Sequence, residues 1–94
     1  MTNLTQLLKP GVVVGEQVGV LFEHARQNQY ALPAVNVVGT NSVNGVLETA
    51  AKVKSPVIVQ LSNGGAAFFV GKGIGLSGIE ASVLGAVAAA KYVH

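Results

Sequence analysis

Three residue types are absent from this chain of 94 residues: cysteine, tryptophan and aspartate. Without cysteine there is neither a disulfide framework nor a thiolate metal site, so the fold must hold by packing, which suits a cytoplasmic protein. The only acidic residues are four glutamates at positions typical of exposed surfaces or helix starts, so a paired-carboxylate site is not supported. The two histidines, His24 and His94, are far apart, and we expect no metal ligand within the chain.

Charged and aromatic residues are also scarce. Six basic residues are scattered along the chain, and the three Phe and two Tyr do not alternate with them, so we expect no nucleic-acid partner. The longest apolar stretch, over residues 81–90, is far shorter than a membrane span, which needs about 20 residues. The first residues lack the basic and apolar regions of a secretion signal. We therefore expect no membrane partner.

Hydrophobic periodicity predicts an α/β fold. Half of the residues are apolar, and segments with helical spacing alternate with two apolar runs typical of buried parallel strands. A helical crossover between these runs favours parallel pairing. The first half of the chain is predicted to form helices over 3–9 and 15–28, a strand over 31–38, and a helix from an N-cap at Thr40 or Asn41 to Lys54. The second half is predicted to form a strand over 57–61, a polar turn over 62–65, a short helix or strand over 66–70, and a flexible loop over 71–75. A final helix is predicted over 79–93, with a capping box formed by Ser77 and Glu80.

The last predicted helix needs more neighbours than the chain supplies. It is apolar almost all round, so it must be covered on several sides, whereas only two strands and few facing helices are predicted. A chain this short also leaves about a third or more of its unfolded surface exposed after folding. We therefore expect much of the intended core to lie beyond His94.

Two glycine-rich motifs resemble nucleotide-binding loops. Residues 73–78 fit G-x-G-x-x-G, but they do not follow the first strand closely, and no acidic residue follows about 20 positions later. The sequence around Lys72 departs from the P-loop motif at two positions. We therefore interpret Lys72 as a solvent-exposed charge in a loop. An alternative is a non-catalytic α/β module that binds a small anion through backbone N–H groups at residues 64–65 or 73–78.

Polar residues stand at the ends of the two predicted strands. Asn36 is the polar exception in the first strand, and Ser62 and Asn63 follow the second. In parallel α/β folds the carboxyl edge of the sheet carries the functional site. The alternative is structural, with Asn36 satisfying backbone groups and Ser62 and Asn63 starting a turn. The pattern alone leaves both open.

Longer stretches resemble one enzyme family, the class II fructose-bisphosphate aldolases. The resemblance rests on residues spread over essentially the whole chain: KPGV (9–12), ALPAVN (31–36), GTNS (39–42), LETAA (47–51), SPVIVQ (55–60), SNGGA (62–66) and GKG (71–73). It points to the branch of the bacterial and yeast glycolytic enzymes, with tagatose-bisphosphate aldolases as a near alternative.

The resemblance implies an α/β fold that is the N-terminal portion of a (β/α)₈ TIM barrel, with residues 1–94 holding leading helices and the first two βα units of a single aldolase domain. It also implies reversible cleavage of fructose 1,6-bisphosphate to dihydroxyacetone phosphate and glyceraldehyde 3-phosphate. A divalent metal, usually zinc, is expected to act as Lewis acid in the full-length protein. A phosphorylated sugar substrate and a homodimer are expected as partners.

The family's functional residues carry over only in part. Ser62 matches a family serine that contacts the substrate, Asn36 matches a strand-end asparagine at the active-site edge, and Asn63 adjoins Ser62. The catalytic Asp and the first metal-ligand His are expected shortly after His94, so no catalytic residue and no metal ligand is expected within the chain. We therefore expect these 94 residues to be inactive alone.

Overall fold

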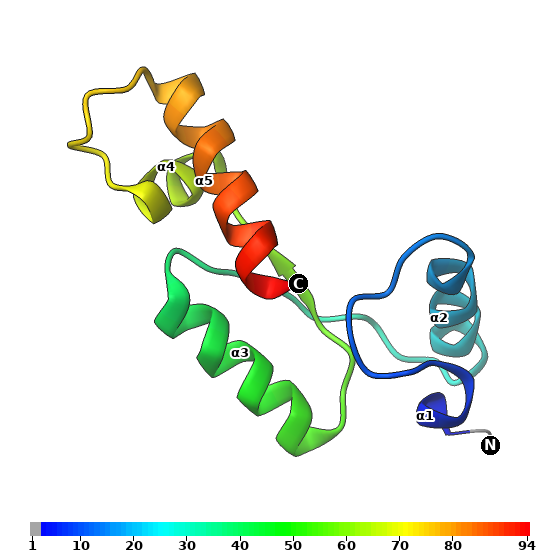
Figure 1. Ribbon diagram of the computed structural model, residues 1–94. Helices are drawn as coiled ribbons and strands as arrows, with labels where there is room; N and C mark the ends of the chain where they lie inside the picture. Colours follow the sequence, from blue (N-terminus) through cyan, green and yellow to red (C-terminus); the bar gives the residue numbers. More distant parts are fainter. Residues whose placement is uncertain (1–2) are drawn as a thin grey trace. The chain divides into compact units, whose positions relative to one another are not determined.

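The computed structural model describes residues 3–94, which divide into two compact units, one ending at Leu32 and one running from Pro33 to His94 (Figure 1). The first unit holds two helices, α1 (Leu4–Leu7) and α2 (Glu16–Gln27). The second holds β1 (Ala34–Asn36), α3 (Thr40–Val53), β2 (Ile58–Gln60), α4 (Asn63–Val70) and α5 (Gly78–Val93). None of the helices within the described residues is long and apolar enough to cross a membrane.

The longer helix of the first unit, α2, is amphipathic. Helix α2 begins after Gly15, whose φ of 60° favours glycine, and it buries Leu21 and Ala25. After its last turn, the Tyr30 hydroxyl lies 2.8 Å from His24 Nδ1, and the two rings meet edge to face with centroids 5.6 Å apart. His24 therefore packs against Tyr30, in the segment that follows the helix.

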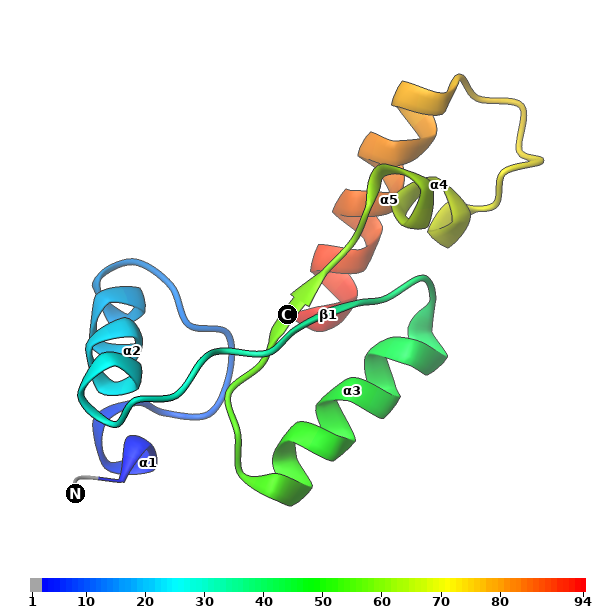
Figure 2. The ribbon, with the colours of Figure 1, turned by 180° about the vertical axis from the view of Figure 1, so that it is seen from behind.

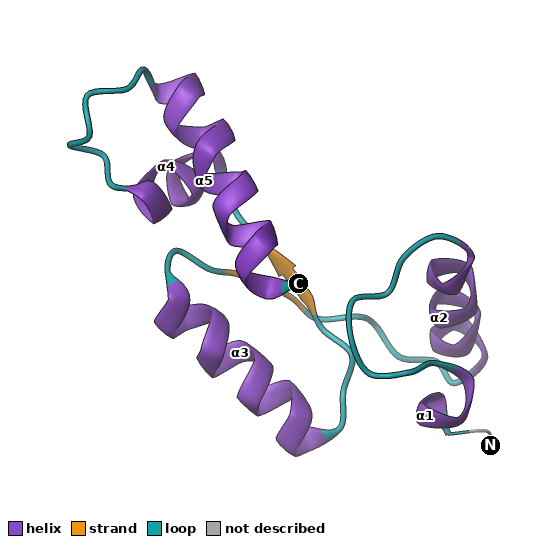
Figure 3. Ribbon diagram, in the orientation of Figure 1, coloured by secondary structure: helices purple, strands orange, loops and turns teal. Residues whose placement is uncertain are grey.

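The second unit is a parallel β-α-β unit, as predicted. Strands β1 and β2 pair in parallel, with Ala34 opposite Ile58 and Asn36 opposite Gln60, and α3 connects them (Figures 2 and 3). Both strands are shorter than predicted. They are also not buried, since Val35 is 38% exposed, because a sheet of two strands with one flanking helix leaves much of its surface uncovered.

The small core of this unit lies next to the strand ends rather than beneath the strands. Val37, directly after β1, and Val43, in the first turns of α3, are 1% and 0% exposed. Helices α4 and α5 pack closely against each other, and small residues fill their contact. The remaining buried apolar residues of the unit are Ala66, Ala67, Ala81 and Ala89.

Two predicted boundaries were wrong. The N-cap of α3 is Gly39, where Thr40 or Asn41 was predicted, because Ser42 Oγ accepts hydrogen bonds from the backbone N–H groups of Val38 and Gly39 at 3.0 and 3.1 Å. Residues 62–65 are not a turn, because they form the cap and the first turn of α4. The segment 66–70, predicted as either helix or strand, continues that helix.

The start of α5 confirms Ser77 as its N-cap, but the Glu80 carboxylate accepts from the Ser77 hydroxyl and not from the Ser77 backbone N–H of the predicted capping box. Ser77 is the N-cap: its hydroxyl accepts from Glu80 N–H at 3.2 Å and donates to a Glu80 carboxylate oxygen at 2.9 Å. Within the described residues α5 packs on α4 and touches α3, where Tyr92 donates to Asn44 Oδ1 at 2.7 Å. Its outer side chains Ile79 and Val83 stay 81% and 60% exposed.

Candidate active-site edge

The last residues of the two strands carry a polar pair. Asn36 and Gln60 are partners in the parallel register, so both side chains project from the same face of the sheet. Gln60 Nε2 donates to Asn36 Oδ1 at 2.5 Å, and both residues are exposed. The two amides are thus held together at the carboxyl edge and keep further donors and acceptors for a ligand.

Gln60 was not among the candidate site residues predicted from the sequence. Its position repeats that of Asn36, because each is a polar residue ending an apolar strand. The two residues are neighbours only in a register that places Asn36 opposite Gln60, and the register cannot be determined from the sequence alone. The backbone pairing therefore supplies a partner for Asn36 that the pattern alone could not.

Ser62 lies two residues beyond β2 and is the N-cap of α4. Its Oγ accepts a hydrogen bond from Gly65 N–H at 3.0 Å, which satisfies one of the first backbone donors of the helix. Because the oxygen acts as acceptor in that bond, its own proton remains available for donation to a ligand. Ser62 therefore has a structural role as the cap of a helix, not as the start of the predicted turn, and this role leaves its hydroxyl proton for a ligand.

Gly65, in the first turn of α4, lies close to the residues that follow β1. A Cβ built on Gly65 would lie 3.2 Å from Ser62 Oγ, 3.3 Å from the Val37 carbonyl oxygen and 3.4 Å from Val38 Cγ1. The first turn of α4 thus lies directly against the segment that follows β1. This contact places Ser62 and the end of β1 at one edge of the unit.

Asn63 faces a different neighbour. It is exposed, and it lines a groove of about 780 Å³ between α4 and α5 together with Gly64, Lys72 and Ser82. The Lys72 Nζ atom lies 3.9 Å from the place a Cβ on Gly64 would occupy. The structure therefore brings Asn36 together with Gln60, whereas Asn63 and Lys72 line one groove between α4 and α5.

Neither glycine motif is an open nucleotide loop. The N–H of Gly65 is already bonded to Ser62, and Gly65 itself is buried, so the pair at 64–65 is not a free backbone anion site. Residues 73–78 follow helix α4 rather than a strand, which is the wrong context for a dinucleotide fingerprint.

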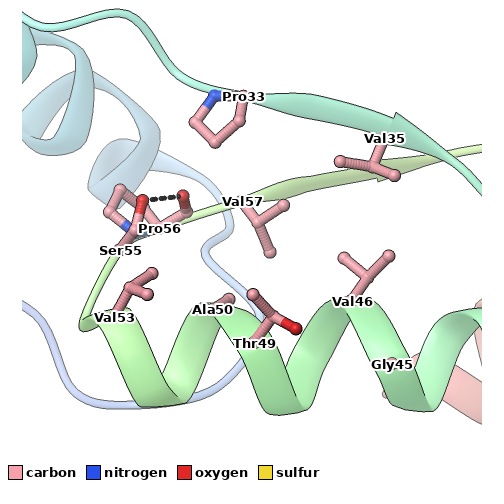
Figure 4. Close-up of a pocket in the computed structure, with 10 residues that line it drawn as sticks. All are labelled: Pro33, Val35, Gly45, Val46, Thr49, Ala50, Val53, Ser55, Pro56 and Val57. Atoms are coloured by element: carbon pink, nitrogen blue, oxygen red, sulfur yellow. Dashed lines mark hydrogen bonds between the residues drawn. The ribbon is translucent and has the colours of Figure 1, made fainter.

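A second cavity, of about 300 Å³, lies between α3 and the two strands (Figure 4). Val35 of β1 and Val57, which directly precedes β2, point toward Val46 and Ala50 of α3. The hydrogen bond drawn in Figure 4 is donated by Ser55 Oγ to the Pro56 carbonyl oxygen, at 2.8 Å, between two residues that line the cavity. With apolar walls and no converging polar groups, this space is a loosely filled helix–sheet interface.

The described residues do not assemble a metal centre. No group of three or more His, Cys, Asp or Glu side chains in residues 3–94 lies close enough to hold a metal ion. The four glutamates are all exposed. Glu23 forms a surface ion pair with Arg26, whose hydrogen bond lowers the pKa of the Glu23 carboxyl. This chain segment therefore does not fit a resident metal by itself.

Comparison with known proteins decides the family. A model of the family described as fructose-bisphosphate aldolase class-II matches residues 16–94. The chain belongs to the class II fructose-bisphosphate aldolase family. This confirms the resemblance indicated by the sequence stretches spread over the chain.

The class II aldolase relatives align over the whole chain. Fructose-bisphosphate aldolase of Haemophilus influenzae is 59% identical over 95 residues, and the class 2 enzyme of Escherichia coli K12 is 54% identical. A crystal structure of the aldolase from Campylobacter jejuni superposes with a TM-score of 0.90 at 46% identity. The α/β fold is therefore that of a portion of the aldolase barrel. The chain spans 26% of the length of each of these three proteins.

Proposed function

We propose that this chain is the N-terminal part of a class II aldolase that reversibly cleaves fructose 1,6-bisphosphate to dihydroxyacetone phosphate and glyceraldehyde 3-phosphate. The supporting observation is 59% identity over the whole chain to a protein named fructose-bisphosphate aldolase. The exposed apolar side chains of α5 and the exposed strands agree with further barrel elements packing against them. In this proposal residues 1–94 are one piece of a single barrel domain and are inactive alone.

We propose that Ser62, Asn36 and Asn63 contact the substrate. Ser62 has a hydroxyl proton to donate, and it stands at the N-terminus of α4, where the helix dipole favours a phosphate. Asn36 is oriented by the Gln60 amide, and its remaining donors suit a hydroxyl or carbonyl oxygen of a sugar. Their part in the reaction is to bind and orient the substrate.

The metal belongs to the same proposal. The family is metal-dependent, and zinc would serve the full-length protein as a Lewis acid that polarises the substrate carbonyl. The described residues supply no ligand cluster for it, so the ligands would come from other parts of the full-length protein. A homodimeric state and a cytoplasmic location complete the proposal, and both rest on the family resemblance.

Substrate choice tests this proposal. Zinc-loaded full-length protein is assayed for release of dihydroxyacetone phosphate from fructose 1,6-bisphosphate and from tagatose 1,6-bisphosphate, before and after chelation. We expect faster cleavage of the fructose compound, loss of activity with chelator and recovery with added zinc. Faster cleavage of tagatose 1,6-bisphosphate would reassign the substrate. Cleavage of neither compound would refute the proposed activity.

A further inference from the structure

Helix α5 approaches α4 at one glycine. Gly85 is buried in the middle of α5, and a Cβ built there would lie 1.7 Å from the Ala66 carbonyl oxygen and 2.5 Å from its carbonyl carbon. Real side chains do not make such contacts, so only glycine permits this crossing. Three other helical glycines, Gly19, Gly45 and Gly78, would meet nothing within 4 Å. The close approach is therefore particular to Gly85.

The contacted residue belongs to the turn that begins at Ser62. Ala66 N–H donates to the Ser62 carbonyl oxygen at 2.8 Å, which closes that turn. On its other side the turn is packed, through Gly65, against the Val37 carbonyl oxygen. The first turn of α4 is thus clamped between α5 and the end of β1, and any shift of α5 is transmitted to it because packed interiors yield little.

A second contact lies one turn earlier on α5. Ser82 Oγ lies 3.0 Å from the Asn63 carbonyl oxygen and 2.8 Å from the Gly78 carbonyl oxygen, so its hydroxyl can donate to either. Residues 82 and 85 are three apart and share one helix face. Figures 1 and 2 show α4 and α5 side by side from opposite directions. Both contacts therefore act on the first turn of α4.

We propose that Gly85 and Ser82 are positioning residues, which act through α4 to hold Ser62 at the substrate-binding edge. The inference rests on the proposed function, in which Ser62 binds substrate. Neither residue need touch the substrate. Small displacements of a binding group weaken catalysis strongly, so a helix contact that fixes the position of Ser62 affects substrate affinity.

Replacement of the glycine is the main test. In full-length protein, Gly85→Ala forces α4 and α5 apart, and we expect KM for fructose 1,6-bisphosphate to rise about tenfold with a smaller change in kcat, as for loss of one charge-assisted hydrogen bond. Gly45→Ala is the matched control, because it adds the same methyl group to a helix where nothing lies within 4 Å. The control should keep the wild-type KM.

A double-mutant cycle separates positioning from general damage. If Gly85 acts through Ser62, adding Gly85→Ala to a Ser62→Ala variant causes no further rise in KM. Independent, multiplying effects of the two substitutions would overturn the proposal. So would a wild-type KM for folded Gly85→Ala.

A milder variant covers the case in which Gly85→Ala does not fold. Ser82→Ala removes the hydrogen bond to Asn63 without adding bulk, and we expect KM to rise about threefold, with the rise abolished in the Ser62→Ala background. A Ser82→Ala protein with wild-type KM would then refute the positioning role. Failure of the underlying function is distinct: wild-type protein would not cleave the substrate, or Ser62→Ala alone would leave KM unchanged.

Discussion

Two serines of this chain make the same local structure in different places. Ser62 and Ser77 each cap a helix by accepting a backbone N–H three residues ahead, from Gly65 at 3.0 Å and from Glu80 at 3.2 Å. Ser62 lies two residues beyond strand β2, whereas Ser77 follows the loop after α4. Capping therefore does not distinguish them, and only the position at the carboxyl edge of the sheet gives Ser62 its proposed role.

The largest expected effect comes from placing a negative charge at each cap. Aspartate caps helices as well as serine does, so Ser62→Asp and Ser77→Asp should both fold. At position 62 the carboxylate would repel a substrate phosphate, and we expect KM to rise about 100-fold. At position 77 KM should stay at the wild-type value. Steady-state kinetics of the two full-length variants give both KM values. Equal increases in KM would show that position 62 has no greater part in substrate binding than position 77.

The amide pair should matter less than the charge. Asn36→Ala removes a proposed substrate contact, and we expect kcat/KM to fall about tenfold. Gln60→Ala leaves Asn36 without its partner and should lower kcat/KM by a smaller factor, with no added effect on the Asn36→Ala background.

Asn44→Ala is the control for the amide pair, because it breaks a side-chain bond of similar kind, to Tyr92, away from the edge. It should leave kcat/KM unchanged. A loss of activity as large as that of Asn36→Ala would mean that breaking any side-chain amide hydrogen bond lowers activity. The strand ends would then have no particular role in substrate binding.

The smallest effect should be shared by both serines. Ser62→Ala and Ser77→Ala each remove an N-cap, which costs about 1 kcal/mol of local helix stability. Hydrogen exchange measured by mass spectrometry should therefore speed up about fivefold in the first turn of α4 for one variant and of α5 for the other. Absence of faster exchange in either helix would show that the cap there is not stabilising.

Much of the second unit was predictable from local signals. Apolar runs separated by a helix predicted the parallel strands, and the Ser77 and Glu80 spacing predicted the start of α5. The start of α4 was not found, because two adjacent glycines at 64–65 are typical of a turn. They are accommodated in a helix because the Ser62 hydroxyl accepts a hydrogen bond from Gly65 N–H, and a Cβ at Gly65 would lie only 3.2 Å from Ser62 Oγ and 3.3 Å from the Val37 carbonyl oxygen.

The candidate site was predicted one residue at a time. Asn36 and Ser62 could be identified as polar residues that end apolar strands, whereas their neighbours depend on register and packing. The Gln60 partner of Asn36 follows from the strand register, and the contact of Gly85 with Ala66 follows from the crossing of two helices. Neither the Asn36–Gln60 pair nor the Gly85–Ala66 contact occurs at a characteristic spacing along the sequence, so neither could be predicted from the sequence.

The most direct measurement is a crystal structure of the zinc-loaded full-length protein with dihydroxyacetone phosphate or fructose 1,6-bisphosphate bound. The account predicts a phosphate oxygen within hydrogen-bonding distance of Ser62 Oγ, with Asn36 close to the same ligand. A ligand bound elsewhere, with Ser62 and Asn36 both out of reach of it, would contradict the assignment of the substrate site to the strand ends of this chain.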